Sequence, residues 1–159
     1  MITKFYEDLE RGKEAEGIVL ATLVRKYPEY SFLDVSNERQ YWHRGDIVAT
    51  NTKGERIFIE VKDDSRICDT HNILCEECIW YEDISDFVDG NMHSQYEIYA
   101  VLSRAEQVIY LIDFSVMKKI YKDKGTYKVL PHKGQTSYCY LLPLGEVIAE
   151  GGLIKQIYL

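Results

Sequence analysis

Apolar side chains recur at helical spacing near the N-terminus of the chain. One such stripe predicts a helix over residues 9–27, which ends before Pro28, as helices usually do. The stripe consists of Val19, Leu20, Leu23 and Tyr27. Residues 30–35 follow as a short predicted strand, and residues 36–40 form a polar connection. The chain therefore begins with an amphipathic helix followed by a strand.

The next two runs of β-type residues flank a polar turn and predict a hairpin, on which the rest of the chain is organised. The runs span residues 44–49 and 56–62. With Gly54 in the left-handed position of a three-residue loop, the register places Val48 opposite Phe58. This hairpin is the strongest structural prediction that the pattern makes.

Charged side chains converge at the open end of the hairpin. The register places Asp46 opposite Glu60, with Cβ atoms about 5 Å apart. Side chains alternate along a strand, so Lys62 lies on the same face as Glu60. Two facing carboxylates repel each other, but Mg²⁺ favours one or two carboxylates together with water and phosphate oxygens. A lysine beside such an ion can position the metal-bound water or stabilise the charge of a phosphoryl-transfer transition state.

The second half of the chain alternates apolar strands with helical segments. Residues 97–102 and 108–112 are near-continuous apolar runs, typical of strands buried on both faces, and they need helices over them. The remaining predicted elements are helices over residues 80–88 and 115–121, strands over residues 127–130 and 138–142, and an apolar end over residues 147–159. This order predicts an α/β fold: a first helix, a mixed sheet built on the hairpin, and helices on both faces of the sheet.

Length and charge limit the interpretation. The 159 residues suit a single domain, and no run approaches the roughly 20 apolar positions of a membrane helix. The N-terminus lacks a signal-peptide pattern, so we expect a cytoplasmic protein. The net charge of −7 argues against broad, non-specific binding of nucleic acid, which usually leaves a basic footprint. It does not exclude a nuclease, because site acids contribute to this charge and a bound metal ion offsets part of it.

The most basic stretch lies late in the chain, despite the acidic total. It is a candidate DNA-facing surface, although an ordinary solvated face is the alternative for each single lysine. The lysines are Lys118, Lys119, Lys122, Lys124, Lys128 and Lys133.

The charged residues of the hairpin resemble a known motif. Gly45-Asp46, followed on the next strand by Glu60-Val61-Lys62, is similar to the core of the PD-(D/E)xK nuclease superfamily, with glycine in place of the proline. The resemblance implies a restriction-endonuclease-like fold and a metal-dependent nuclease. It implies that Asp46, Glu60 and the backbone carbonyl of Val61 bind Mg²⁺ or Mn²⁺. It also implies that Lys62 orients the attacking water.

A third acid lies on the first predicted helix. Glu16 precedes Val19 and Leu20 by three and four positions, hence it lies on the inward stripe. An unpaired carboxylate is costly to bury, so Glu16 needs an ion or a partner unless it lies at the edge of the stripe with its carboxylate in water. The spacing Gly12-x-x-x-Glu16 resembles the first-helix motif of many PD-(D/E)xK nucleases, whose glutamate completes the metal site.

Polar and cationic side chains flank the motif on both sides. Arg44 precedes the first acid and suits a phosphate, with an ion pair as its alternative role. Trp42 can stack on a base, but burial in the core is its favoured interpretation. Arg66, Thr70 and Asn72 follow the lysine in a loop suited to phosphates, and we predict that they bind nucleic acid together with Arg44. The Thr70-x-Asn72 segment also resembles one that phage-type members of the superfamily carry after the lysine.

A cluster of cysteine and histidine raises a separate hypothesis. Cys68, His71, Cys75 and Cys78 are of the residue types that bind zinc. A regular strand over residues 72–78 would place Cys75 and Cys78 on opposite faces. Reduced thiols, as in most cytosolic proteins, are therefore the expected state, and a small zinc-binding adaptor is the competing interpretation.

Together these features predict a Mg²⁺-dependent endonuclease that hydrolyses phosphodiester bonds, with DNA as the expected substrate. Resolvase-like, restriction-like and phage-type enzymes all stay open, because substrate choice lies in loops and oligomer geometry. A homodimer is expected for cutting two strands. The contrasting hypothesis is a catalytically inactive module that keeps the fold to bind protein or nucleic acid. Net acidity favours this module, and the intact Asp46, Glu60 and Lys62 disfavour it.

Overall fold

Two sheets form the framework of the structure. A computed structural model describes the backbone of residues 2–159 and the side chains of residues 6–159. In spatial order, the larger sheet comprises β1 (Ser31–Asp34), β2 (Ile47–Thr50), β3 (Arg56–Asp63), β6 (Ile98–Ser103), β7 (Val108–Asp113) and β10 (Leu153–Tyr158). The smaller sheet comprises β5 (Asp86–Asp89), β4 (Asn72–Tyr81), β9 (Gln135–Pro143) and β8 (Thr126–His132). The helices are α1 (Ile2–Lys26), α2 (Ile67–Thr70), α3 (Phe114–Lys124) and α4 (Leu144–Ala149), with single 3₁₀ turns η1 (Arg39–Tyr41) and η2 (Asn91–His93).

The larger sheet is mixed, as predicted. β3 runs parallel to β6, whereas the other neighbouring strands are antiparallel. The predicted hairpin between β2 and β3 is confirmed, with Val48 opposite Phe58. Gly54 has a φ of +84°, and the Asn51 side-chain oxygen accepts hydrogen bonds from the backbone N–H groups of Lys53 and Glu55. The turn residues therefore set the register that brings the charged end of the hairpin together.

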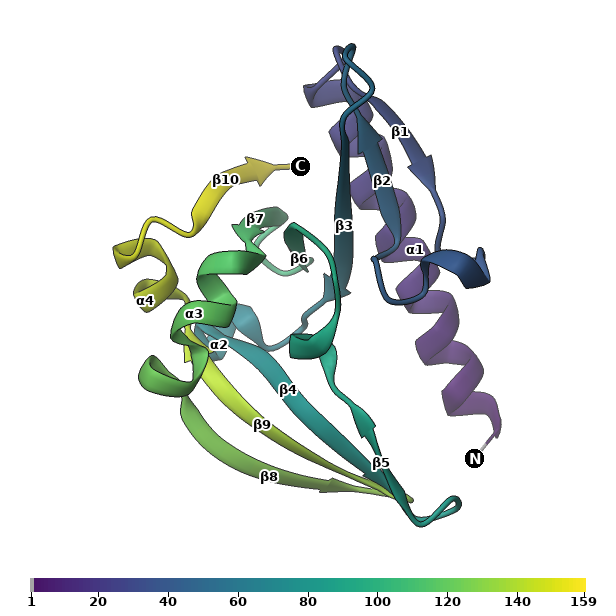
Figure 1. The fold of residues 1–159 in the computed structure, drawn as a ribbon, viewed down its shortest axis with the longest axis vertical. Helices are drawn as coiled ribbons and strands as arrows, with labels where there is room; N and C mark the ends of the chain where they lie inside the picture. Colours follow the sequence, from purple (N-terminus) through teal and green to yellow (C-terminus); the bar gives the residue numbers. More distant parts are fainter. Residues whose placement is uncertain (1) are drawn as a thin grey trace.

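The layers differ on the two faces of the larger sheet (Figure 1). α1 covers one face, where its Ala15, Val19 and Leu23 are buried against the sheet. The opposite face packs on α3, α4 and the base of the smaller sheet, which contributes Ile73 and Leu142 to that core. The prediction of helices on both faces is confirmed, but it omitted the second sheet.

The smaller sheet extends from the core as an arm, which tapers to the turn between β4 and β5 and the turn between β8 and β9 (Figure 1). Its edge strands β5 and β8 are exposed along their whole length. The connection from β3 to β6 passes through this arm, because β4 and β5 lie between them in the chain. The chain therefore leaves the charged hairpin, builds part of the arm and returns beside it.

The helix predicted over residues 80–88 is wrong, since this segment forms the turn from β4 into β5. Trp80 lies opposite Phe87 in the pairing of these strands, with ring centroids 4.9 Å apart. Phe87 also contacts Tyr138 of β9, at 5.8 Å between centroids. Cross-strand aromatic contacts stabilise a hairpin here and override a weak helical pattern.

The helices and strands after residue 96 agree more closely with those predicted from the sequence. α3 begins where Asp113 caps it, since its side chain accepts a hydrogen bond from the Ser115 N–H at 2.9 Å. The strands predicted over residues 97–102, 108–112, 127–130 and 138–142 are all present, each with slightly different ends. The apolar C-terminal segment divides into α4 and β10.

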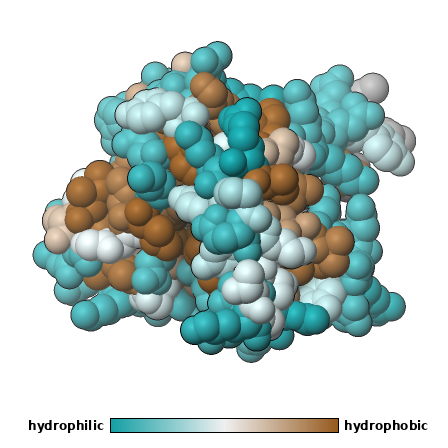
Figure 2. Space-filling model, turned by 90° about the horizontal axis from the view of Figure 1, so that it is seen from above, coloured by the Kyte–Doolittle hydropathy of each residue, from teal (hydrophilic) through white to brown (hydrophobic). Residues whose placement is uncertain are grey.

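Apolar side chains also reach the surface. Seen from above, hydrophobic residues form separate patches with hydrophilic residues between them (Figure 2). Near the C-terminal end, Ile148, Ile154 and Leu159 are exposed. Within the described residues, no helix has both the length and the apolar character needed to cross a membrane. The homodimer that we expect for cutting two strands stays a prediction.

Candidate active site

A glycine turn sets the position of the first acid. Gly45 has a φ of +107°, and a Cβ there would lie 2.6 Å from the carbonyl oxygen of Ile59. The next N–H, of Asp46, donates a hydrogen bond to that same oxygen at 2.8 Å. The Asp46 side chain turns toward β3, where its Oδ2 accepts a hydrogen bond from the Val61 N–H at 2.9 Å. Only glycine fits a backbone of this conformation so close to a neighbouring strand.

The second acid and the lysine share one face of β3. Lys62 Nζ lies 3.4 Å from Glu60 Oε1. Ile59 and Val61 point the other way, into the core beneath α1. In the parallel pairing with β6, Glu60 lies beside Tyr99. The charged cluster therefore lies where the sheet changes from antiparallel to parallel pairing.

The site is electrostatically strained when both acids are ionised. The pKa of Glu60 is raised to about 7, chiefly by burial, with Lys62 opposing the rise and Asp46 adding to it. Burial also raises the pKa of Asp46, against the lowering effect of the Val61 hydrogen bond. Burial lowers the pKa of Lys62, but Glu60 and Asp46 outweigh this effect, so its pKa is raised overall. Lys62 is therefore an ammonium at neutral pH, beside two carboxylates that resist ionising together.

Glu16 approaches this cluster from α1. Its side chain is half-buried, and its pKa is raised first by burial and then by the charge of Asp46. Both observations agree with the predicted inward position. Glu14 lies at the margin of the helix instead, where its Oε2 forms an ion pair with Arg104 at 3.2 Å.

Backbone oxygen is also available beside Asp46. The N–H and C=O of one strand residue face the same neighbouring strand, so the Val61 carbonyl faces Asp46 as its N–H does. Across the described side chains, no group of three or more histidine, cysteine, aspartate or glutamate residues is arranged to hold a metal ion. A hard cation here would therefore bind the two carboxylates and complete its coordination with backbone and water oxygens.

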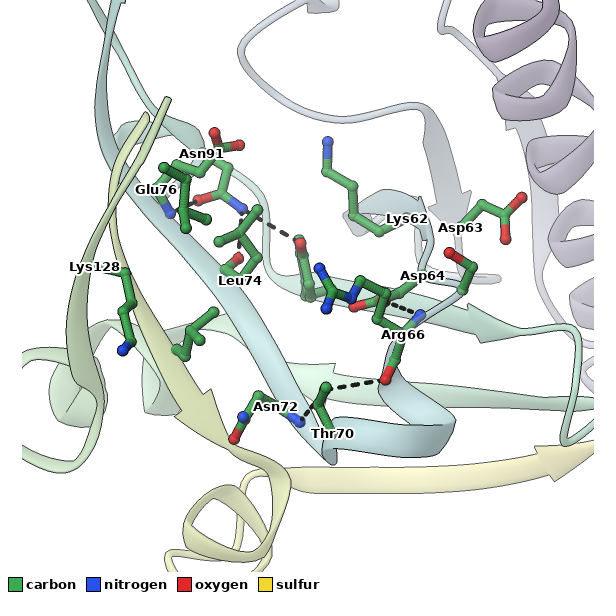
Figure 3. Close-up of a pocket in the computed structure, with 14 residues that line it drawn as sticks. Lys62, Asp63, Asp64, Arg66, Thr70, Asn72, Leu74, Glu76, Asn91 and Lys128 are labelled. Atoms are coloured by element: carbon green, nitrogen blue, oxygen red, sulfur yellow. Dashed lines mark hydrogen bonds between the residues drawn. The ribbon is translucent and has the colours of Figure 1, made fainter. Parts of the chain in front are cut away.

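A pocket of about 620 Å³ adjoins the cluster and shares Lys62 with it (Figure 3). Arg66, Thr70 and Asn72 line this pocket, so the loop predicted to bind nucleic acid does lie beside the lysine. Asp64 shapes the loop, because its Oδ1 accepts hydrogen bonds from the N–H groups that begin α2, at 2.8 and 3.1 Å. The structure thus brings three of the four predicted nucleic-acid residues to one concave site.

No protein-family model, curated protein or solved structure matches the chain. Its function must therefore be inferred from the residues of the hairpin and the pocket.

The residues that precede Asp46 lie outside the pocket. The Arg44 guanidinium lies over the Phe58 ring, 4.0 Å from its centroid, on the face of β3 that carries Glu60. Within the described residues Arg44 forms no ion pair, so its interpretation as a salt-bridge partner is not supported. The interpretation of Trp42 as a core residue is wrong, since 64% of it is exposed. Trp42 ends the 3₁₀ turn η1 at the surface, where the Arg39 guanidinium lies 5.9 Å from its ring.

The lysines of the basic stretch after β7 differ in the groups that they contact. Lys122 forms an ion pair with Glu77 at 3.0 Å, and Lys118 lies 5.2 Å from the ring of Phe114. Lys128 lines the pocket opposite Lys62. The stretch is therefore not one surface, and only Lys128 joins the candidate site.

A β-bulge changes the side of the strand on which one of the clustered cysteines lies. Cys75 lies opposite Tyr140 of β9, and a register shift after Glu76 sets Cys78 opposite Tyr138, on the same face of the sheet. The expectation of opposite faces is wrong because it assumed a regular strand. Cys75 is fully buried, and burial raises the pKa of its thiol to about 12. The zinc hypothesis gains no support from this arrangement.

Sequence reasoning missed Tyr99, Asn91 and Glu76. Tyr99 was part of an apolar strand, yet its hydroxyl accepts a hydrogen bond from Asn91 Nδ2 at 3.3 Å at the pocket wall. Glu76 lines the pocket from β4, where its Oε2 accepts a hydrogen bond from Ser137 Oγ at 2.9 Å. Tyr99 reaches the site because β3 pairs in parallel with β6, some forty residues later in the chain. Such a distant pairing leaves no local sequence signal by which these groups could be predicted.

Proposed function

We propose that this chain is a metal-dependent nuclease that hydrolyses phosphodiester bonds, with Mg²⁺ or Mn²⁺ as the ion and DNA as the expected substrate. The observation that carries the proposal is the group formed by Asp46, Glu60 and Lys62. Burial holds the pKa of Glu60 near 7, next to a second acid and 3.4 Å from an ammonium. Such perturbed, converging groups are typical of catalytic sites.

The arrangement of elements also supports the proposal. α1, the meander β1-β2-β3 and the parallel strand β6 occur in the order that the PD-(D/E)xK resemblance implies. We propose a restriction-endonuclease-like core on this basis. The arm is an addition to that core: β4 and β5 are inserted between β3 and β6, and β8 and β9 follow α3.

The donor set suits a hard divalent ion. Asp46 and Glu60 would hold it together with the Val61 carbonyl, and Glu16 would tune the site from α1. Two carboxylates with water and phosphate oxygens are the ligands that Mg²⁺ prefers. The ion, when bound, lowers the pKa of a water molecule and neutralises charge on the phosphate. Positive charge also offsets the repulsion by Asp46, which adds to the effect of burial on the pKa of Glu60.

Lys62 would position the attacking water and stabilise negative charge. As an ammonium it donates hydrogen bonds and cannot accept a proton, so it orients the attacking water and stabilises negative charge on the phosphoryl oxygens. Arg44 and Arg66 are placed on either side of it along the chain and would hold flanking phosphates. Losing one positioned electrostatic group of this kind costs a factor of about 10²–10³ in rate.

The test is cleavage of a panel of nucleic acids with Mg²⁺ or Mn²⁺ at low salt: linear duplex, single strand, flap and four-way junction. Asp46→Ala should abolish both cleavage and stabilisation by the metal. Asp89→Ala, which changes an exposed acid on β5, is the matched control and should leave both intact. Cleavage of none of the substrates, or equal cleavage by the two variants, would refute the proposal.

A second candidate is an inactive module that binds protein or nucleic acid through the same fold. The net charge of −7 and the lack of a three-ligand group among the described side chains favour it. Metal-induced thermal stabilisation distinguishes the two candidates, because a working acid pair gains stability when it binds its ion. An inactive module should show no stabilisation that depends on Asp46.

A further inference from the structure

The pocket beside Lys62 has apolar walls drawn from both sheets. Leu74, Leu130 and Leu141 line it from β4, β8 and β9, and Tyr99 of β6 reaches its wall with the hydroxyl that contacts Asn91. Its volume of about 620 Å³ lies within the range of small-ligand sites, roughly 300–1,000 Å³. Three leucine side chains provide an apolar surface against which a planar group can pack.

The polar groups on these walls are fixed and directed at the cavity. Asn91 uses its side-chain oxygen to accept from the Glu76 N–H at 2.7 Å, and its nitrogen donates to Leu74 O and Tyr99 Oη (Figure 3). Because Tyr99 Oη accepts from Asn91, its own proton is available to a ligand. The Asn72 side chain lines the pocket and has no hydrogen-bond partner within the described residues. The Asn91 amide is thus used within the protein, whereas the Asn72 amide and the Tyr99 hydroxyl can read the donors and acceptors of a base edge.

The charges around the pocket leave two cations for a ligand. Arg66 and Lys128 line the pocket, and neither side chain forms an ion pair within residues 6–159. Three acids also line the pocket, and each accepts hydrogen bonds through one oxygen. Asp63 Oδ2 accepts from Arg11 and Arg104 on the α1 side of β3, Asp64 Oδ1 accepts from the N–H groups that begin α2, and Glu76 Oε2 accepts from Ser137. Unpaired cations at the rim of an apolar pocket suit a phosphate attached to a base.

We propose that this pocket holds one unpaired nucleotide of the substrate strand, with its base against the leucines, its edge at the Tyr99 hydroxyl and its phosphate at Arg66 and Lys128. The inference rests on the proposed nuclease function, because Lys62 belongs to both the pocket and the acid cluster. The nucleotide in the pocket therefore neighbours the phosphate at Asp46 and Glu60. A double helix is too wide to enter a cavity of this size between two sheets, so the substrate class is single-stranded or locally unpaired nucleic acid.

The first experiment measures binding without catalysis. A fluorescein-labelled single strand of about 12 nucleotides and a blunt duplex of the same sequence are titrated with the full chain in EDTA, and anisotropy reports binding. The single strand should bind at least tenfold more tightly, since base stacking contributes about 1–3 kcal/mol per base. A duplex that binds as tightly as the single strand would overturn the pocket assignment.

The second experiment fills the pocket. Leu130→Trp places a bulky ring in the cavity from an exposed edge strand, and Val129→Trp places the same ring on the opposite face of β8. Leu130→Trp should weaken single-strand binding about tenfold or more and leave duplex binding unchanged, whereas Val129→Trp should change neither. Equal affinities of the two variants for the single strand would refute the proposal.

These experiments separate the two proposals. Selective binding in EDTA without any cleavage in Mg²⁺ would support the pocket and refute the nuclease. Cleavage with equal activity of both tryptophan variants on single strands would support the nuclease and refute the pocket. Unchanged circular dichroism spectra of both variants establish that the comparison is between folded proteins.

Discussion

The substitution Glu60→Gln tests whether the charge of Glu60 destabilises the folded protein when no cation is bound beside Asp46. The change keeps the shape of the side chain and removes its charge. In the parent protein Glu60 is largely buried, with 18% of its side chain exposed, and burial with the charge of Asp46 raises its pKa to about 7. An acid whose pKa is raised by folding makes the folded state bind its proton more tightly than the unfolded state does.

The sign and size of the effect follow from this pKa. The stability of the parent protein should fall as pH rises from about 4.5, the ordinary value, to about 7, and the contribution of Glu60 should level off above that. The full difference corresponds to at most about 3.5 kcal/mol, at about 1.4 kcal/mol for each unit of pKa. Glu60→Gln should therefore be more stable than the parent at pH 8 without metal, by up to that amount, and similar to it at pH 4.5. The lost attraction to Lys62 makes the observed gain smaller than this limit.

The assay is urea unfolding followed by circular dichroism at pH 4.5, 6 and 8, in EDTA and in Mg²⁺. Glu29→Gln, at an exposed position, is the control and should follow the parent protein at every pH. Mg²⁺ should stabilise the parent at pH 8 more than at pH 4.5, because protons compete for the same oxygens, and should not stabilise Glu60→Gln. A stability gap between parent and Glu60→Gln that does not grow with pH would refute the reasoning.

Three further substitutions, the last paired with a control, test the residues around this acid. Lys62→Ala should lower cleavage by about 10²–10³-fold while metal-induced stabilisation is kept or increased, because a competing cation has gone; cleavage equal to the parent's in a steady-state assay would contradict this. Glu16→Gln should weaken the thermal shift caused by Mg²⁺ without abolishing it, and an unchanged shift would show that Glu16 takes no part in the site. Gly45→Ala should cost more than about 2 kcal/mol in urea unfolding, since its Cβ meets the Ile59 carbonyl at 2.6 Å in a left-handed conformation. Gly54→Ala, with a left-handed φ but open space around it, should cost about 1 kcal/mol, and equal costs for the two would contradict the steric argument.

The hairpin could be predicted from the sequence because its determinants are local. The turn around Gly54 fixes the pairing, and the pairing fixes which residues face each other. Asp46 and Glu60 were thus brought together by two short strands and a turn of known geometry. Lys62 followed from alternation alone, and its 3.4 Å contact with Glu60 agrees with that placement.

The arm and the pocket could not be predicted, because they depend on contacts between distant segments. β4 pairs with β9, some sixty residues later in the chain, and β3 pairs in parallel with β6. Nothing near Tyr99 or Lys128 in sequence indicates that they face Lys62 across a cavity. The prediction for Trp42 was wrong for another reason: hydrophobicity favours burial, but Trp42 ends the 3₁₀ turn η1 with its side chain at the surface.

The negative net charge, which weighs against a nuclease, is easier to reconcile with the proposed substrate than with a duplex. Affinity for a long duplex depends on many phosphate contacts, and a chain with a charge of −7 is poorly suited to provide them. Four acids also lie at or near the tip of the arm: Glu82, Asp83, Asp86 and Asp89. A single nucleotide needs only the cations that line the pocket and an apolar surface for its base. Lys62, Arg66 and Lys128 are these cations, and Leu74, Leu130 and Leu141 form the apolar surface. A single bound nucleotide requires fewer phosphate contacts than a long duplex, so an unpaired substrate is compatible with the acidic chain.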